Sequence, residues 1–498
     1  MADRSEVEMR INGRATFAAA AYLIGVGLTF VLERIGAPDA LVRNLGPSIA
    51  LFVLALIGVL SRSSRMSAVF TADRLPPPIY AGAALAAIAA GFAIVFFTAQ
   101  AGERGPLAAI PAGLLLGAVF FGPLARRSGA SSLSDLLSAR FPSSILRIVF
   151  ALAYFAIGAL IAAAGFESAV RALSSFVGVS RETSIAVIAI SAVLIVIPGG
   201  LAGLLWAGAA AAGMIAAVFL APILAHPPSE AGLAAPIWQG GAEAAAVLAQ
   251  SWWQLDPRAR ALDAAAIAVG FSVIPPVFVA GLASANQTRA MQSGIVGVAL
   301  AALLALAFFV ALPLWPKMGN VAAAGLHGSA GLLAAVICAS AGVHTASRAV
   351  AFEARGYGLQ TVLASRRLAG TRQLAFLAVA LSAILSYREM IPPSTALLGA
   401  SALALVATGP SLALAASQRA NSLHALAAIV VSLGAIVGLA ELQGWVFVSE
   451  HAPAASLAAA AAGFAVGWAA SLFVGGRTQS GVNGAQTLFV EPPPDPGA

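Results

Sequence analysis

The stretch AVGFSVIPPVFVAGL, residues 268–282, decides the fold. It belongs to an apolar run long enough to cross a bilayer, yet Pro275 and Pro276 stand in its middle. Two adjacent prolines remove backbone donors and predict a helix that is broken or kinked there. At bilayer depth, an interrupted helix is tolerated where it meets protein or a water-filled cavity, and transporters place binding sites at such breaks. A packed proline kink without a cavity is the alternative.

The rest of the chain is equally apolar. Of its 498 residues, 60% are hydrophobic and 9% are charged, and the mean hydropathy is +0.93. Soluble globular proteins do not have this composition, so the bilayer is the solvent. About fourteen apolar runs of roughly 17 to 25 residues predict an all-α, polytopic membrane protein. They lie near 15–33, 46–61, 78–99, 107–125, 144–166, 183–198, 201–225, 262–283, 295–315, 329–351, 372–387, 393–416, 424–446 and 454–474.

The charges predict the orientation. The net charge is +7, but the arginines are dispersed among the loops and not gathered on one face, so nucleic acid is not a predicted partner. When successive loops are placed on alternate sides, most arginines fall on the side that holds both termini. This predicts a multi-pass protein of the cytoplasmic (inner) membrane with both termini in the cytoplasm. The polar, Pro/Gly-rich residues 475–498 predict a disordered cytoplasmic tail.

A polar stripe follows one face of the helix predicted at 329–351, where Ser340, His344, Ser347 and Arg348 share a side. Ionisable residues at depth are costly and mark a pathway or a paired site, and His344 can carry a proton near neutral pH. A structural role for His344 is the alternative. For Arg348 the expectation is an ordinary helix end, where the side chain snorkels to the interface.

Other polar groups are sparse. Thr98 and Ser272 are candidate cavity-lining hydroxyls, which together with Pro275, Pro276 and His344 make the predicted substrate-binding set; hydroxyls in membrane helices also bond the preceding turn. Glu167 and Arg171, four residues apart, predict a helix-end ion pair without a functional role. Catalytic, zinc-protease and nucleotide-loop spacings are not seen in the sequence, so neither an enzyme nor a cofactor is expected.

Five stretches together resemble the sodium:solute symporter family. They correspond in order and spacing to its A-G-R-like turn with the first core helix, its R-x-G segment, its G-G-L-x-A-V segment, its Q-R-x-L-A-A-K-S element and a late P-x-x-L helix. The stretches are AVFTADRLPPPIYAGAALAAIAAGFAIVFF (68–97), LARRSGASSLSDLLSARFPSSILRIVFALAYF (124–155), FVGVSRETSIAVIAISAVLIVIPGGLAGLLWAGAAAAG (176–213), GLASANQTRAMQS (281–293) and GASALALVATGPSLALAASQRANSLHA (399–425).

The resemblance implies a LeuT-like core of five plus five helices in inverted repeat, its first and sixth helices unwound at the midplane. In this chain those helices would be 78–99 and 262–283. The ten-helix core would then occupy 63–423, with two transmembrane helices before it in 1–62 and two after it in 424–474.

The family's sodium site does not carry over intact. Its backbone carbonyls would correspond to Ala86 and Ala89, but its hydroxyl pair aligns with Cys338 and Ala339. A thiol is a poor ligand for a hard cation, and a methyl group is none. Ser340, one residue further on, restores a ligand if the register shifts.

The resemblance therefore implies a secondary transporter that moves a small organic solute by alternating access. The shortage of polar groups favours a monocarboxylate. Sodium coupling is weakened, and proton coupling through His344 is the candidate replacement. The predicted partners are the lipid bilayer and the solute, with a membrane-protein partner left open. The alternative is a membrane sensor or partner-binding protein that kept the scaffold without transporting.

Overall fold

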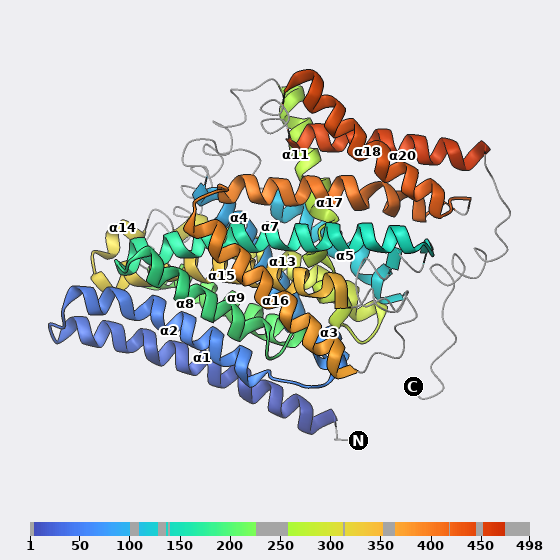
Figure 1. The fold of residues 1–498 in the computed structure, drawn as a ribbon. Coiled ribbons are helices and arrows are strands. Elements are labelled where there is room, and N and C mark those ends of the chain that lie inside the picture. The colour runs from blue at the N-terminus through green and yellow to red at the C-terminus, as the bar shows by residue number, and fades with distance from the viewer. Residues whose placement is uncertain are drawn as a thin grey trace, which may run out of the picture.

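A computed structural model describes residues 4–99, 109–127, 136–137, 140–225, 257–311, 314–351, 364–417, 419–444 and 452–473. The regular structure in these ranges is helical throughout, without a strand. Most of the long helices run side by side in one bundle, with their axes horizontal in Figure 1. The predicted tail, 475–498, lies outside the described residues.

The helices follow one another along the chain in this order: α1 (Arg4–Arg34), α2 (Asp39–Leu60), α3 (Met66–Thr71), the 3₁₀ turn η1 (Ala72–Arg74), α4 (Pro78–Ala99), α5 (Ala109–Arg127), α7 (Ser144–Val177), α8 (Arg181–Val196), α9 (Leu201–Ala225), α11 (Pro257–Ser272), the 3₁₀ turn η2 (Pro275–Phe278), α12 (Val279–Ala283), α13 (Gln287–Ala311), α14 (Trp315–Met318), α15 (Val321–Ala351), α16 (Ala364–Tyr387), α17 (Pro393–Ala415), α18 (Ser422–Gln443) and α20 (Ala452–Phe473).

Every predicted apolar run overlaps a helix. By length and composition, ten described helices are long and apolar enough to cross a membrane, or eleven when α11, η2 and α12 are taken as one bent span. The runs near 15–33, 107–125 and 183–198 correspond to α1, α5 and α8, which are not among those ten. The described chain is therefore a multi-pass membrane protein, and the count of fourteen spans stays a prediction.

The helix predicted to break at its prolines is broken. α11 ends at Ser272, η2 begins at Pro275, and the axes on the two sides of the break differ by 55°. The prolines open this turn because they cannot donate to the preceding helix.

The other expected break is absent, and the prediction that 78–99 unwinds at the midplane is wrong. α4 is one unbroken helix from Pro78 to Ala99. Its sequence is rich in alanine and holds no proline between Ile79 and Ala99. Alanine is the best helix former, and an unwound turn at depth leaves backbone groups without partners.

α15 lies at the centre of the bundle and packs tightly on α7. A side chain added at Gly165 of α7 would meet the backbone of Ala339, and one added at Gly342 of α15 would meet the backbone of Ala162. Small residues at both positions let the two backbones approach closely, as helices in lipid often do. The pair forms the closely packed middle of the molecule.

The flanking helices are tied to this middle. The carboxylate of Glu33, in the last turn of α1, accepts bonds from the backbone N–H groups of Val321 (2.7 Å) and Ala322 (3.2 Å). It thereby satisfies donors that the N-terminus of α15 leaves free. At the other end of the chain, Gly463 of α20 packs on the backbone of Ala428 in α18.

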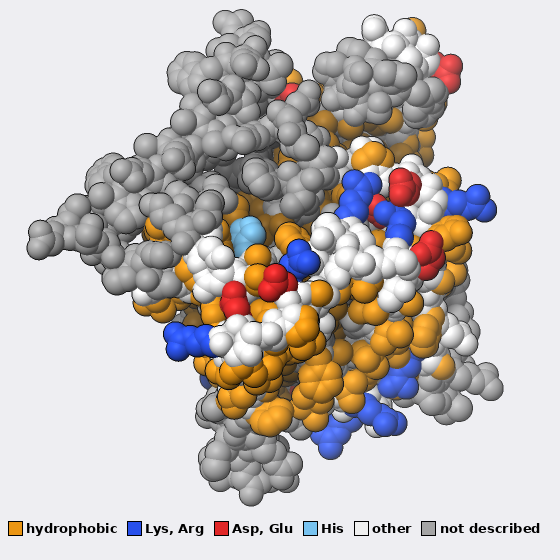
Figure 2. All heavy atoms as spheres, turned by 90° about the vertical axis from the view of Figure 1, so that its left-hand side faces the viewer, with side chains coloured by type: hydrophobic (Ala, Val, Ile, Leu, Met, Phe, Trp, Pro, Cys, Tyr) orange, Lys and Arg blue, Asp and Glu red, His pale blue; other side chains and the backbone are white. Residues whose placement is uncertain are grey.

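The two ends of the bundle differ from its sides. Large hydrophobic side chains such as Ile24, Phe52 and Leu152 are exposed on the sides, as a lipid-facing surface requires. The end with the α1–α2 turn and α14 lies on the left in Figure 1, and we call it the Arg181 end after the first residue of α8. The opposite end carries α3, and we call it the Arg348 end because Arg348 bonds to Phe70 of α3 there. Basic and acidic side chains lie close together on the Arg181 end, which Figure 2 faces.

Candidate functional site

A cavity of about 380 Å³ opens between α4, α7, α9, α13, α15 and α17 near the Arg181 end. Its volume lies in the range of small-molecule sites. Its polar lining comes from Ser168, Arg171 and Ser175 of α7 and from His327 of α15. The three residues of α7 are spaced three and four apart, so they share one face of the helix. Phe176, Phe219 and Phe308 add apolar walls.

The floor of the cavity is the packed middle of the bundle. Ala335 of α15 lines the cavity, and its carbonyl lies against Gly165 of α7. Cys338, less than one turn further along α15, is fully buried and lies near Gly91 of α4. The cavity therefore ends where α4, α7 and α15 meet.

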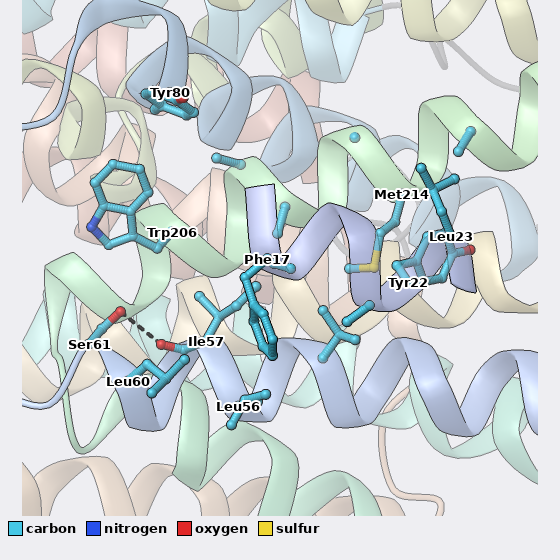
Figure 3. A pocket seen from close by; sticks show the side chains of 17 residues that line it. Phe17, Tyr22, Leu23, Leu56, Ile57, Leu60, Ser61, Tyr80, Trp206 and Met214 are labelled. Carbon is cyan, nitrogen blue, oxygen red and sulfur yellow. Dashed lines mark hydrogen bonds between the residues drawn. The ribbon is translucent and has the colours of Figure 1, made fainter. Parts of the chain in front are cut away.

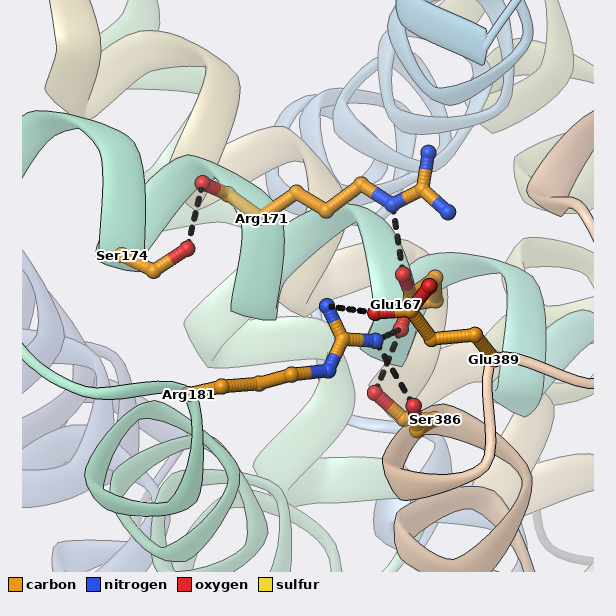
Figure 4. A network of polar contacts seen from close by, with 6 residues as sticks. All are labelled: Glu167, Arg171, Ser174, Arg181, Ser386 and Glu389. Carbon is orange, nitrogen blue, oxygen red and sulfur yellow. Dashed lines mark hydrogen bonds and ion pairs between the residues drawn. The ribbon is translucent and has the colours of Figure 1, made fainter.

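A buried carboxylate organises the polar groups beside the cavity (Figure 4). The side chain of Glu167 is 4% exposed, and its Oε1 accepts a bond of 2.5 Å from Arg171 Nε. Its Oε2 accepts bonds from Arg181 Nη2 (2.7 Å) and from the hydroxyl of Ser386 (2.5 Å). Arg181 also pairs with Glu389 at 3.3 Å. The network joins α7, α8 and the end of α16.

The predicted Glu167–Arg171 ion pair is thus confirmed, but its predicted place at the helix end is wrong. α7 continues to Val177, so the pair does not lie at the helix end. Buried charges are stable only when they are paired and hydrogen-bonded, and Glu167 meets both conditions. The sequence signal that could have revealed this was an acid directly after an apolar run, since ionisable residues at membrane depth are expected to be functional.

At the opposite end, Arg348 closes the bundle. Arg348 is 7% exposed, its Nη2 donates to the carbonyl of Phe70 in α3 (2.7 Å), and its guanidinium carbon is 5.5 Å from the centre of the Phe70 ring. Arg348 Nη1 is 3.4 Å from His344 Nε2. The expectation that Arg348 snorkels to the interface is wrong, because α3 covers the end of α15 and buries the guanidinium.

The residues expected to bind sodium lie on α4 and α15, where few of their oxygen atoms are available to a cation. Ala86 and Ala89 lie in the regular part of α4, so their carbonyls accept bonds within the helix. On α15, the thiol of Cys338 is 4.0 Å from the carbonyl of Ile161, and the backbone of Ala339 is packed against α7. Ser340 Oγ is buried without a hydrogen-bond partner among the described residues.

The predicted substrate-binding residues are not gathered in the cavity. Ser272 Oγ bonds the carbonyl of Val269 in its own helix (2.7 Å), and Pro275 and Pro276 form the break beside it. His344 lies with Arg348 around a space of about 10 Å³, which is too small for a solute. Thr98 lies in α4, but its side chain is outside the described residues. Sequence reasoning missed the cavity because its lining comes from six helices.

A second cavity, of about 270 Å³, lies between α1, α2, α4 and α9 (Figure 3). Phe17, Leu56 and Met214 form apolar walls, and the rings of Tyr80 and Trp206 lie 5.2 Å apart at one side. Its described hydroxyls come from Tyr22, Tyr80 and Ser61, and that of Ser61, directly after α2, donates to the carbonyl of Ile57. Its described lining holds no charged side chain and no histidine, so the cavity lined by Arg171 and His327 is the candidate site for a charged solute.

The sequence matches no protein-family model and no curated protein. Its structure is similar to that of a Na⁺-coupled sialic acid symporter, solved in a substrate-bound outward-open state. The TM-score is 0.69 at 16% identity, and the match covers 88% of this chain and 98% of that one. A manganese transporter from Eremococcus coleocola also matches, with a TM-score of 0.46, 13% identity, and coverage of 80% of this chain and 95% of that one. The chain therefore shares the fold of the sialic acid symporter.

Proposed function

We propose that the protein is a secondary active transporter that moves a small organic solute across the cytoplasmic membrane by alternating access. The observation that carries this proposal is the one-sided cavity. The space lined by Arg171 and His327 reaches the packed middle of the bundle, while Arg348 and Phe70 are bonded to each other at the opposite end. Alternating access requires such a state, with the site reachable from one side and closed from the other.

The helix contacts support a core of five plus five helices in inverted repeat within residues 63–423. In such a repeat each helix of the first five is equivalent to the helix five places later in the core. A contact between the first and seventh core helices should therefore have a counterpart between the sixth and second, and a contact between the fifth and eighth should have one between the tenth and third. α4 packs on α13, and α11 packs on α5. Likewise α9 packs on α15, and α17 packs on α7. The helices in 1–62 and 424–474 would then flank this core.

The positive-inside rule supports placing the Arg348 end in the cytoplasm, together with both termini. The cavity would then face outward. Coupling to sodium is not favoured, because Cys338 and Ala339 stand where a hard cation needs hydroxyl oxygens. We keep a proton as the candidate coupling ion.

Uptake into proteoliposomes tests the proposal. The purified chain is reconstituted and offered radiolabelled lactate, pyruvate, propionate, glycerol and alanine, with sodium replaced by choline in a parallel series and with or without an inward proton gradient. We expect one or more of the monocarboxylates to accumulate above protein-free liposomes at equal rates in sodium and choline. A proton gradient should raise that accumulation.

The outcomes separate the alternatives. Accumulation that requires sodium overturns the coupling proposal and leaves the transport proposal standing. If no solute accumulates from this panel or a wider one, the protein is a sensor or partner-binding protein on a transporter scaffold.

A further inference from the structure

The charges of the side chains that line the solute cavity indicate which kind of ligand it binds. Among its described lining residues, Arg171 is the one permanent cation, and no acidic side chain is present. Glu167 is next to the cavity but does not line it, and its side chain is 4% exposed whereas that of Arg171 is 54% exposed. A ligand in the cavity therefore meets the guanidinium and is shielded from the carboxylate.

The bond to Glu167 leaves the binding edge of Arg171 available. It uses Nε, while Nη1 and Nη2 have no hydrogen-bond partner among the described residues. In Figure 4 these two nitrogens point away from Glu167 and Arg181. Two parallel N–H donors on one planar group match the two oxygens of a carboxylate. An amine is repelled by the guanidinium, and a neutral sugar offers oxygens without the opposite charge.

The other walls limit the size and charge of the ligand. Phe219 and Phe308 contact each other edge to face, with 5.3 Å between ring centres, and the His327 ring packs at 4.8 Å on that of Trp315 behind the cavity wall. They suit a short apolar body. The described lining holds no second permanent cation that could neutralise another carboxylate. The cavity therefore favours a ligand with one negative charge over a ligand with two.

We propose that Arg171 is the substrate-binding residue for a small organic monocarboxylate, received between Nη1 and Nη2 in the cavity. This inference rests on the proposed function for its biological meaning, but binding can be measured without transport. His327 closes the same cavity from α15, and Ser168 and Ser175 add hydroxyls along α7.

The experiment measures thermal unfolding of the full chain in detergent at constant ionic strength. Lactate, pyruvate, propionate and benzoate are each compared with the corresponding neutral amide. We expect at least one carboxylate to raise the Tm in a saturable way and its amide to have no effect. Arg171→Gln should abolish the shift, and Arg171→Lys should weaken it by supplying charge without the planar fork. Arg289→Gln, at an exposed position outside the cavity, is the matched control and should keep the shift.

A carboxylate shift that survives in Arg171→Gln, an equal shift from the amide, or no shift from any of the four acids overturns the assignment. Transport is scored separately in proteoliposomes. Carboxylate uptake unaffected by Arg171→Gln removes the proposed site but not the transporter, whereas Arg171-dependent binding without uptake removes the transporter but not the site.

Discussion

Cys338 shows how far a single residue can be interpreted from the sequence. Its thiol and the methyl group of Ala339 predicted a weakened sodium site, and the structure places both on a helix that packs against α4 and α7. What the sequence could not show was that α4 stays helical, so that the carbonyls of Ala86 and Ala89 remain within it. A carbonyl carries no side-chain signal, and its availability depends on the local backbone.

The glycines of α15 allow a direct test of the packing in the middle of the bundle. A methyl group at Gly342 would meet the backbone of Ala162 on α7, whereas one at Gly331, on the same helix, would meet nothing within 4 Å. We expect Gly342→Ala to lower the stability by about 1–3 kcal/mol, the usual cost of overpacking. Gly331→Ala should leave the Tm unchanged or slightly higher. Equal Tm values for the two variants would show that α7 and α15 are not closely packed at Gly342.

At the scale of the element, one break was predictable and the other was not. Pro275 and Pro276 specify the interruption after α11 by removing donors, whatever surrounds them. Unwinding of α4 was inferred from the family resemblance, and no residue between Ile79 and Ala99 requires it. The burial of Arg348 could not be predicted for a similar reason. It depends on α3, a six-residue helix far away in the sequence, and no residue near Arg348 indicates that contact.

The contact between α15 and α3 should control access to the middle of the bundle. Removing the guanidinium with Arg348→Gln takes away the bond to Phe70 and loosens the Arg348 end. Because Cys338 is the single cysteine and is fully buried, its labelling by N-ethylmaleimide reports the opening. We expect slow labelling of the native chain and several-fold faster labelling of Arg348→Gln.

Arg289→Gln, at an exposed position, is the control and should label as slowly as the native chain. Equal rates in all three proteins, with Arg348→Gln still eluting as a folded species from gel filtration, would show that Arg348 does not close this end.

At the scale of the whole molecule, hydropathy located the helices but not the site. Each apolar run overlaps a helix because burial in lipid demands a long apolar segment. The cavity, by contrast, is lined by Arg171, His327 and Phe308 from helices far apart in sequence. No local pattern joins these residues, although Arg171 and His327 each lie within a few residues of an apolar run, where ionisable side chains are expected to be functional.

Solute counterflow tests the central claim most directly. Proteoliposomes loaded with an unlabelled monocarboxylate are diluted into a trace of the same labelled acid, with choline as the only added monovalent cation on both sides. A carrier that alternates its access should concentrate the label transiently inside, and Arg171→Gln should abolish that overshoot. If the native chain gives no overshoot with any monocarboxylate, or gives one only when sodium replaces choline, the account of a sodium-independent monocarboxylate transporter is contradicted.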